Sequence, residues 1–156
     1  MLGIDAGAVR VGLAASDPTR LIASPVATLA RREGAGLWER LAAEIEARRP
    51  ERIIVGLPRR LDGSSGRAAA AARELATEIG RRTGLPVEMW DEWLTSVEAE
   101  RILIGGGMRR RHRRDTVDAV AASLMLQAWL DRQRVAPHGG GKQPRAHAAR
   151  RADGHA

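Results

Sequence analysis

The stretch that decides the fold is Met1-Leu2-Gly3-Ile4-Asp5-Ala6-Gly7-Ala8-Val9-Arg10-Val11-Gly12-Leu13-Ala14-Ala15-Ser16-Asp17. A short apolar run ends in Asp5, turns, and returns as a second apolar run, which predicts a β-hairpin of strands 2–5 and 10–15. A carboxylate buried against a hydrophobic sheet is costly unless it is paired or bound to a cation. Asp5 therefore points to a metal or phosphate-handling site, with a simple turn aspartate as the alternative.

The rest of the chain alternates strand and helix patterns. These predicted elements are strand 24–29, helix 37–48, strand 52–56, helix 67–83, strand 85–91, a helix from Thr95 or Ser96 to Ile104, and helix 115–134. Runs rich in β-branched residues mark the strands, and apolar residues spaced three to four apart mark the helices. This order predicts an α/β fold whose mixed five-stranded sheet has an antiparallel hairpin edge and parallel strands, flanked by helices.

Composition narrows the protein class. The 156 residues suit one domain with a real core, which we place at 1–134, and the aperiodic basic tail 135–156 is expected to be disordered. The absence of cysteine excludes disulfides and thiolate zinc sites. No apolar run reaches membrane-spanning length and the sequence opens on a predicted strand, so we expect a cytoplasmic protein without a membrane partner. Four tryptophans with no Phe or Tyr argue against an RRM-type stacking surface.

The net charge of +7 is concentrated in two places, the tail and one run of arginines. That run consists of Arg109, Arg110, Arg111, Arg113 and Arg114, and we expect it to form a loop before the last helix. Such a distribution suits a polyanionic partner. For the tail, we prefer the interpretation that its arginines are surface residues without a function. For the run, we prefer contact with a polyanion, and a solvated charge cluster is the alternative.

The acidic residues are expected to meet at one edge of the sheet. In α/β folds the functional residues gather beyond the carboxyl ends of the parallel strands. Asp5 ends the first strand, and Asp91 with Glu92 ends the fifth. Right-handed crossovers allow the later strand to neighbour the first, so that both acidic ends face one crevice. Asp115 and Asp118 lie three residues apart and so on one face of the last helix.

This carboxylate set predicts a site for Mg²⁺ or Mn²⁺, because it contains no cysteine or histidine and hard cations prefer oxygen ligands. Two such ions can activate water and stabilise the leaving oxygen in phosphodiester cleavage. Structural alternatives remain at each position. Asp115 can cap the helix, Asp118 suits its positive N-terminal turn, and Asp91 or Glu92 can pair with an arginine.

The arginine run stands directly before the helix carboxylates, as a nuclease would require for gripping phosphates. Arginine also makes bidentate phosphate contacts. Arg10, in the hairpin, is expected either to contact phosphate or to pair with Asp17. The hairpin glycines are expected to let a nucleic-acid backbone approach Asp5.

Four motifs, in order, together resemble one family. They are Gly3-Ile4-Asp5-Ala6-Gly7-Ala8-Val9-Arg10-Val11-Gly12 with Ser16-Asp17, then Ile54-Val55-Gly56-Leu57-Pro58 with Asp62-Gly63-Ser64, then Asp91-Glu92-x-Leu94-Thr95-Ser96-x-Glu98-Ala99, and last Asp115-x-x-Asp118-Ala119-x-Ala121-Ala122. The chain resembles the YqgF/RuvX-like family of pre-16S rRNA nucleases and Holliday-junction-resolvase-like proteins, which has the RNase H-like fold. The resemblance covers residues 2–131.

The resemblance implies a metal-dependent nuclease that processes the 5′ end of precursor 16S rRNA in ribosome biogenesis. It implies catalytic, metal-binding acids at Asp5, Glu92 and Asp118, with Asp91 and Asp115 beside them. Trp93 stands where the family usually has arginine, so a phosphate contact from that place is lost.

Other functions remain open at this stage. A Holliday-junction resolvase and a non-catalytic RNA-binding factor of ribosome assembly would use the same arginines. An ATPase resembling actin or Hsp70 is disfavoured, because the chain is too short for a two-lobed cleft. Site chemistry does not separate RNA from DNA, and the protein is expected to be a monomer or a homodimer, with cleavage of a symmetric junction favouring the dimer.

Overall fold

The predicted hairpin lies in the middle of the protein's structure, which is a computed structural model. The structure describes residues 1–31, 35–58, 66–92 and 110–135, and it leaves out the side chains at 35, 92 and 110–115. The elements in chain order are β1 (Leu2–Ala6), β2 (Arg10–Ser16), β3 (Ala23–Ala30), α1 (Ala35–Arg48), β4 (Ile53–Pro58), α2 (Arg67–Thr83), β5 (Val87–Glu92) and α4 (Arg110–Val135).

The five strands form one mixed sheet in the order β3-β2-β1-β4-β5. β2 pairs antiparallel with β1 and with β3, whereas β4 pairs parallel with β1 and with β5. This arrangement confirms the predicted sheet. The expectation that the fifth strand could neighbour the first is wrong, because β4 lies between them. Ile53, Ile54 and Val55 of β4 are fully buried, as expected of an inner strand that lies between β1 and β5.

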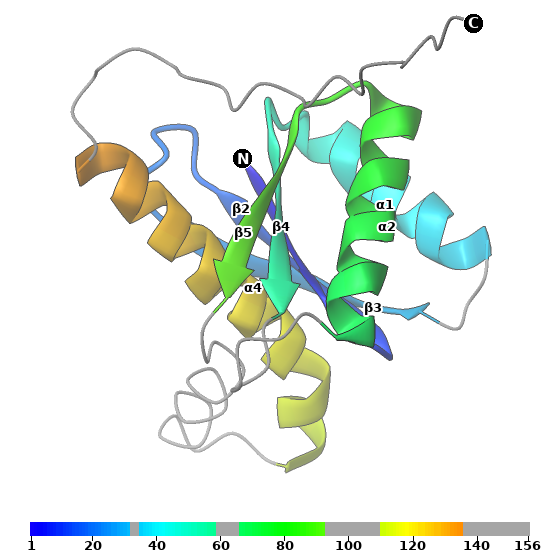
Figure 1. The fold of residues 1–156 in the computed structure, drawn as a ribbon. Coiled ribbons are helices and arrows are strands. Elements are labelled where there is room, and N and C mark those ends of the chain that lie inside the picture. Colours follow the sequence, from blue (N-terminus) through cyan, green and yellow to red (C-terminus); the bar gives the residue numbers. More distant parts are fainter. Residues whose placement is uncertain (32–34, 59–65, 93–109, 136–156) are drawn as a thin grey trace, which may run out of the picture.

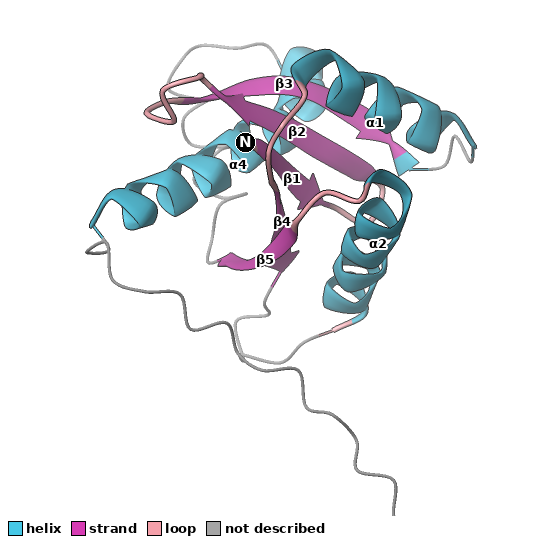
Figure 2. Ribbon diagram, turned by 90° about the horizontal axis from the view of Figure 1, so that it is seen from above, coloured by secondary structure: helices cyan, strands magenta, loops and turns pink. Residues whose placement is uncertain are grey.

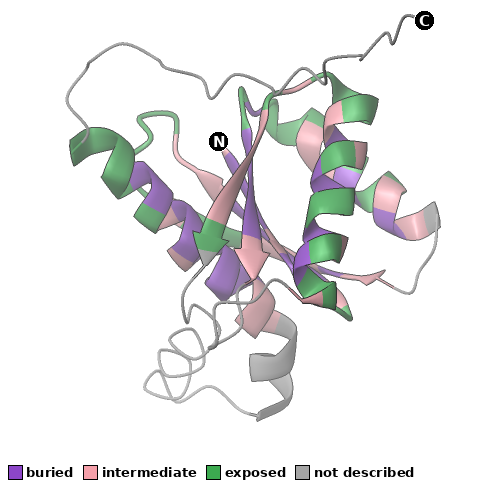
Figure 3. Cartoon of the chain, in the orientation of Figure 1, coloured by how far each residue is buried: buried purple, intermediate pink, exposed green. Residues whose placement is uncertain are grey.

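Helices cover both faces of the sheet. Figure 2 shows α4 on one side and α1 with α2 on the other. Along β1 the side chains alternate, so that Leu2 and Ile4 join the core under α1 and α2, whereas Gly3 meets Leu126 of α4. Asp5, two residues after Gly3, therefore faces α4. Buried residues run along both α4 and the inner strands (Figure 3).

α4 begins earlier than the sequence predicts. Its first residue is Arg110, five positions before the predicted start, so residues 110–114 are helical and not part of a loop. Arginine is a good helix former, which explains why the helix extends through this run. Asp115 consequently lies inside α4, and its interpretation as the helix N-cap is wrong. Figure 1 shows that α4 starts beyond the carboxyl ends of β4 and β5 and then runs back past them.

Two further predictions fall outside the described residues, namely the helix from Thr95 or Ser96 to Ile104 and the disordered tail. None of the helices in the described ranges combines the length and hydrophobicity needed to cross a bilayer.

Candidate active site

α4 packs most tightly on the sheet where it crosses β2. A Cβ atom added to Gly12 would lie 1.9 Å from the backbone oxygen of Asp118, and one added to Gly3 would lie 2.9 Å from Cβ of Leu126. Both glycines therefore make room for α4, not for the nucleic-acid backbone that the sequence suggested. Gly7 has a different reason, since an added Cβ would lie 2.6 Å from the Arg10 carbonyl oxygen across the turn.

This packing brings Asp118 to Asp5. Asp5 pairs with Gly12 in the β1–β2 register, and the backbone of Asp118 lies directly over Gly12. Burial, and to a lesser degree the nearby charge of Asp118, raise the pKa of Asp5 from 3.8 to about 6, so the two carboxyl groups interact. An acid on a strand and an acid on a helix, 113 positions apart by their numbers, thus form one site.

Arg10 brings a positive charge to this site. Its Nε donates a hydrogen bond of 2.7 Å to Oδ2 of Asp118, and the two side chains are 35% and 19% exposed. The sequence left Asp17 as another partner for Arg10, but Asp17 instead accepts hydrogen bonds from the backbone N–H groups of Leu21 and Ile22, each at 2.8 Å. The bond from Ile22, then that from the Thr19 hydroxyl, and to a lesser degree the bond from Leu21 lower the pKa of Asp17 to about 2.

The other predicted acids lie on neighbouring elements. Asp91 and Glu92 end β5 and pair with Leu57 and Pro58 of β4, and the Asp91 side chain is exposed. Asp115 precedes Asp118 by about one helical turn. The side chains of Glu92 and Asp115 are not among those described, nor are those of the five clustered arginines, and Arg109 and Trp93 lie wholly outside the described ranges.

The donor chemistry of the site fits a hard divalent cation. Within the described part of the chain no three His, Asp or Glu side chains form a metal-binding group. The carboxylates of Asp5 and Asp118 nevertheless lie close enough to repel each other, and this repulsion adds to burial, the larger cause, in raising the pKa of Asp5. A bound cation would remove that repulsion with the oxygen ligands that Mg²⁺ and Mn²⁺ prefer.

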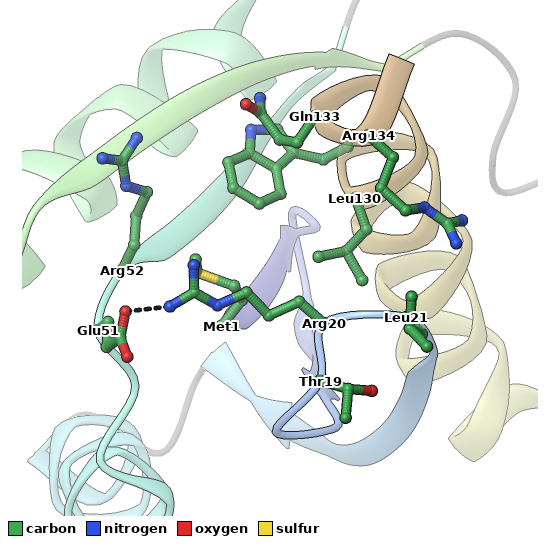
Figure 4. A pocket seen from close by; sticks show the side chains of 10 residues that line it. Met1, Thr19, Arg20, Leu21, Glu51, Arg52, Leu130, Gln133 and Arg134 are labelled. Atoms are coloured by element: carbon green, nitrogen blue, oxygen red, sulfur yellow. Dashed lines mark hydrogen bonds and ion pairs between the residues drawn. The ribbon is translucent and has the colours of Figure 1, made fainter. Parts of the chain in front are cut away.

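A cavity of about 580 Å³ lies at the other end of β1, around Met1 and Leu130 (Figure 4). Three arginines stand in its lining, but each has an acidic partner. Arg20 pairs with Glu51, and Arg52 donates to Glu88 at 2.8 Å. Arg134 likewise pairs with Asp131. The cavity therefore offers neither a carboxylate cluster nor an unneutralised set of arginines, and it is separate from the Asp5–Asp118 site.

Two features of the site were not predicted from the sequence, namely the Arg10–Asp118 ion pair and the role of Gly12. The Arg10–Asp118 ion pair spans 108 positions, so no local pattern shows it. Gly12 was visible only as one of several glycines in the opening motif. A small residue at an inward position of a strand that faces a helix is the signal that marks such a close approach.

Comparison with known proteins places the chain in a family. The sequence model of the RuvX family, described as Holliday junction resolvase, matches residues 1–132. A Lactococcus lactis protein named "Putative pre-16S rRNA nuclease" is 40% identical over 133 residues, which is 84% of this chain and 93% of the relative. A Mycobacterium bovis protein of the same name is 46% identical over 143 residues, covering 88% and 82%.

Solved structures support the same fold. Thermus thermophilus RuvC, in a complex with a Holliday junction substrate, superposes with a TM-score of 0.51 at 17% identity, over 86% of this chain and 96% of RuvC. At that identity the likeness shows the RNase H-like fold alone, which agrees with the mixed sheet described above. The chain belongs to the RuvX family of Holliday junction resolvases and is a phosphodiester hydrolase.

Proposed function

We propose that this protein is a metal-dependent endonuclease that processes the 5′ end of precursor 16S rRNA. The observation that carries the proposal is the pairing of Asp5 and Asp118 beside the carboxyl end of β1, in a chain of a nuclease family. The relatives named as pre-16S rRNA nucleases favour the rRNA substrate. Ribosome biogenesis in the cytoplasm is the matching biological setting.

Asp5, Asp118 and Glu92 are the proposed metal ligands. Trp90 of β5 packs in the core beneath α4, and Glu88 accepts a hydrogen bond of 2.9 Å from the Trp129 indole of α4. Because side chains alternate along a strand, Asp91 lies on the face opposite to that of Glu88 and Trp90, so we keep Glu92 as the proposed ligand. Asp115, about one turn before Asp118, is a further candidate ligand.

Bound Mg²⁺ or Mn²⁺, as one ion or two, would activate water and stabilise the leaving oxygen. The protein's contribution is to fix the carboxylates before substrate arrives. Asp5 is held by the β1 ladder and Asp118 by its close packing over Gly12, so neither has to be reorganised during the reaction. Arg10 and the clustered arginines at 109–114 are proposed to grip the substrate phosphates.

A Holliday-junction resolvase is the second candidate. It is favoured by the description of the matching family and by the fold shared with RuvC. The same carboxylates would then cut branched DNA, and a symmetric junction would favour a homodimer over a monomer. We place the nuclease domain at residues 1–134 and propose that the basic tail 135–156 lies outside it.

The proposed function is tested with Asp118→Asn and a matched control, Asp131→Asn, which changes an exposed aspartate near the other end of α4. With Mn²⁺, the wild type and Asp131→Asn should cleave precursor 16S rRNA. Asp118→Asn should cleave about 1,000-fold more slowly, since a metal site contributes several kcal/mol to the transition state. Rates are measured on end-labelled rRNA and on a four-way DNA junction.

Each result decides between the candidates. Cleavage of the junction in preference to the rRNA would favour the resolvase. Equal cleavage by wild type and Asp118→Asn would refute the metal-nuclease proposal. Tight rRNA binding by a wild type that never cuts would instead identify a non-catalytic assembly factor.

The raised pKa of Asp5 makes metal binding depend on pH. A carboxyl with a pKa of about 6 is ionised at pH 7.5 and mostly protonated at pH 5, and only the ionised form binds a cation. Mn²⁺ affinity should therefore fall as pH drops through 6, approaching tenfold per unit below it, when titrated by calorimetry without nucleic acid. An affinity that stayed constant down to pH 5 would contradict the involvement of Asp5.

A further inference from the structure

The guanidinium of Arg10 lies against the Asp118 carboxylate, the group that is proposed to bind a metal ion together with Asp5. It contacts Oδ2 of Asp118 at 2.7 Å, and Asp118 in turn influences the charge of Asp5. Among the side chains that the structure describes, Arg10 is thus the positive group that contacts Asp118 of this pair. A single positive charge offsets only half of the two negative charges that the pair carries when both groups are ionised.

The ion pair joins two rigid elements. Arg10 begins β2, two residues before Gly12, and the backbone N–H of Arg31 fixes the preceding turn by donating to the Val9 carbonyl at 2.8 Å. Asp118 is fixed by the contact of its backbone with Gly12. The movable part is the Arg10 side chain itself, which is 35% exposed and so can reach solvent.

Arginine stays protonated at any physiological pH, so Arg10 cannot release Asp118 by losing its proton. It can leave only if another cation takes its place. A divalent ion bound between Asp5 and Asp118 would oppose the nearby guanidinium by charge repulsion and compete with it for the same carboxylate oxygen. Once displaced, the guanidinium would stand next to the site with all five donors available for a phosphate.

We propose that Arg10 is an exchangeable counter-charge, which holds Asp118 in the metal-free protein and passes to the substrate phosphate when a divalent cation takes its place. This inference rests on the proposed function, because it assumes that Asp5 and Asp118 bind the cation. It differs from a purely structural role, in which Arg10 would orient Asp118 for the metal and stay in contact with it.

The two roles predict opposite changes in metal affinity. An exchangeable Arg10 competes with the cation, so Arg10→Gln should bind Mn²⁺ more tightly, by about 3-fold to 5-fold if the pair is worth up to 1 kcal/mol. At saturating Mn²⁺, Arg10→Gln should cleave at least about 10-fold more slowly, since its phosphate contact is lost. Arg10→Lys keeps the charge, so its Mn²⁺ affinity should stay near that of the wild type.

Mn²⁺ binding is measured by electron paramagnetic resonance on the full chain without nucleic acid, and cleavage is measured separately. Arg52→Gln is the matched control, because Arg52 pairs with Glu88 away from the site, and it should change neither quantity. Weaker Mn²⁺ binding by Arg10→Gln would overturn the inference in favour of a structural role. Tighter Mn²⁺ binding by Arg10→Gln with an unchanged cleavage rate at saturating Mn²⁺ would also overturn the inference, because Arg10 would then make no contact with the substrate phosphate that matters for cleavage.

Failure of the proposed function would look different. If Asp118→Asn bound Mn²⁺ as well as the wild type, then Asp118 would not be a metal ligand at all, whatever Arg10 does. Thermal unfolding of Arg10→Gln and Arg10→Lys checks that both variants fold.

Discussion

Replacing Asp5 with asparagine should stabilise the metal-free protein at neutral pH while abolishing its metal-dependent activity. Burial raises the pKa of Asp5 from 3.8 to about 6, so the folded state binds this proton more tightly than the unfolded state does. The contribution of Asp5 to the free energy of unfolding therefore falls as the pH rises from about 4 to 6, and it stays low above pH 6. The full pKa difference corresponds to about 3 kcal/mol, and the partly buried position reduces the expected gain to about 1–2 kcal/mol.

The measurement is urea unfolding with a chelator present, at pH 7.5 and at pH 4. Asp5→Asn should be more stable than the wild type at pH 7.5, and the difference should nearly vanish at pH 4, where Asp5 is protonated. Asp131→Asn is the control, and it should change the free energy of unfolding at pH 7.5 in the opposite direction. Asp131 accepts hydrogen bonds from Gln127 and Arg134, which lower its pKa, so its ionised form supports folding. A metal-free Asp5→Asn less stable than the wild type at pH 7.5 would contradict this account.

Adding Mn²⁺ should reverse the order of stability. A ligand that binds only the folded state adds about 2.7 kcal/mol when present at a hundred times its dissociation constant. The wild type should gain this increment and Asp5→Asn should not. Cleavage by Asp5→Asn should fall about 1,000-fold, as expected for loss of a metal ligand. The site thus trades stability in the metal-free protein for the ability to bind a cation.

Much of the fold could be predicted from sequence because its signals are local. Alternating and continuous apolar runs located the hairpin and β4, and the left-handed Gly84, at φ 68°, ends α2 where the glycine predicted. The start of α4 was misjudged, because Asp115 is a good N-cap and the arginines before it were interpreted only as a charged loop. Their helix propensity was the neglected signal.

The meeting of Asp5 and Asp118 at the candidate site was predictable in residue type but not in geometry. A carboxylate at a strand end indicated Asp5, and one on the last helix beside it indicated Asp118, since functional residues of α/β folds gather at that edge of the sheet. The partner of Arg10 did not follow, because the sequence favours a phosphate or the nearby Asp17 and gives no sign of Asp118. The choice depends on how closely α4 approaches β2, which is a property of packing and not of spacing along the chain.

Gly12 controls that approach, and Gly12→Ala should therefore separate the two acids. The added Cβ would lie 1.9 Å from the Asp118 carbonyl oxygen, and both partners are backbone atoms that cannot rotate away. α4 has to shift by about 1 Å or more to restore a normal contact. Overpacking of this kind costs about 1–3 kcal/mol, and we expect the upper end because a whole helix must move.

The matched control is Gly80→Ala in α2. Its added Cβ would meet the nearest atom, Cγ2 of Val87, at 3.6 Å, an ordinary contact. Replacing a helical glycine with alanine should stabilise the protein by about 0.5–1 kcal/mol. The same exchange of glycine for alanine thus has opposite signs at the two positions, which urea unfolding can show directly.

Mn²⁺ titration then separates a site effect from general destabilisation. If Gly12 positions Asp118, Gly12→Ala should bind Mn²⁺ at least about tenfold more weakly under conditions where unfolding shows it to be folded, because displaced ligands lose affinity steeply. Gly80→Ala should bind as the wild type does. A Gly12→Ala variant with wild-type stability and affinity would show that α4 does not rest on β2 at this point, and the pairing of Asp5 with Asp118 would lose its structural basis.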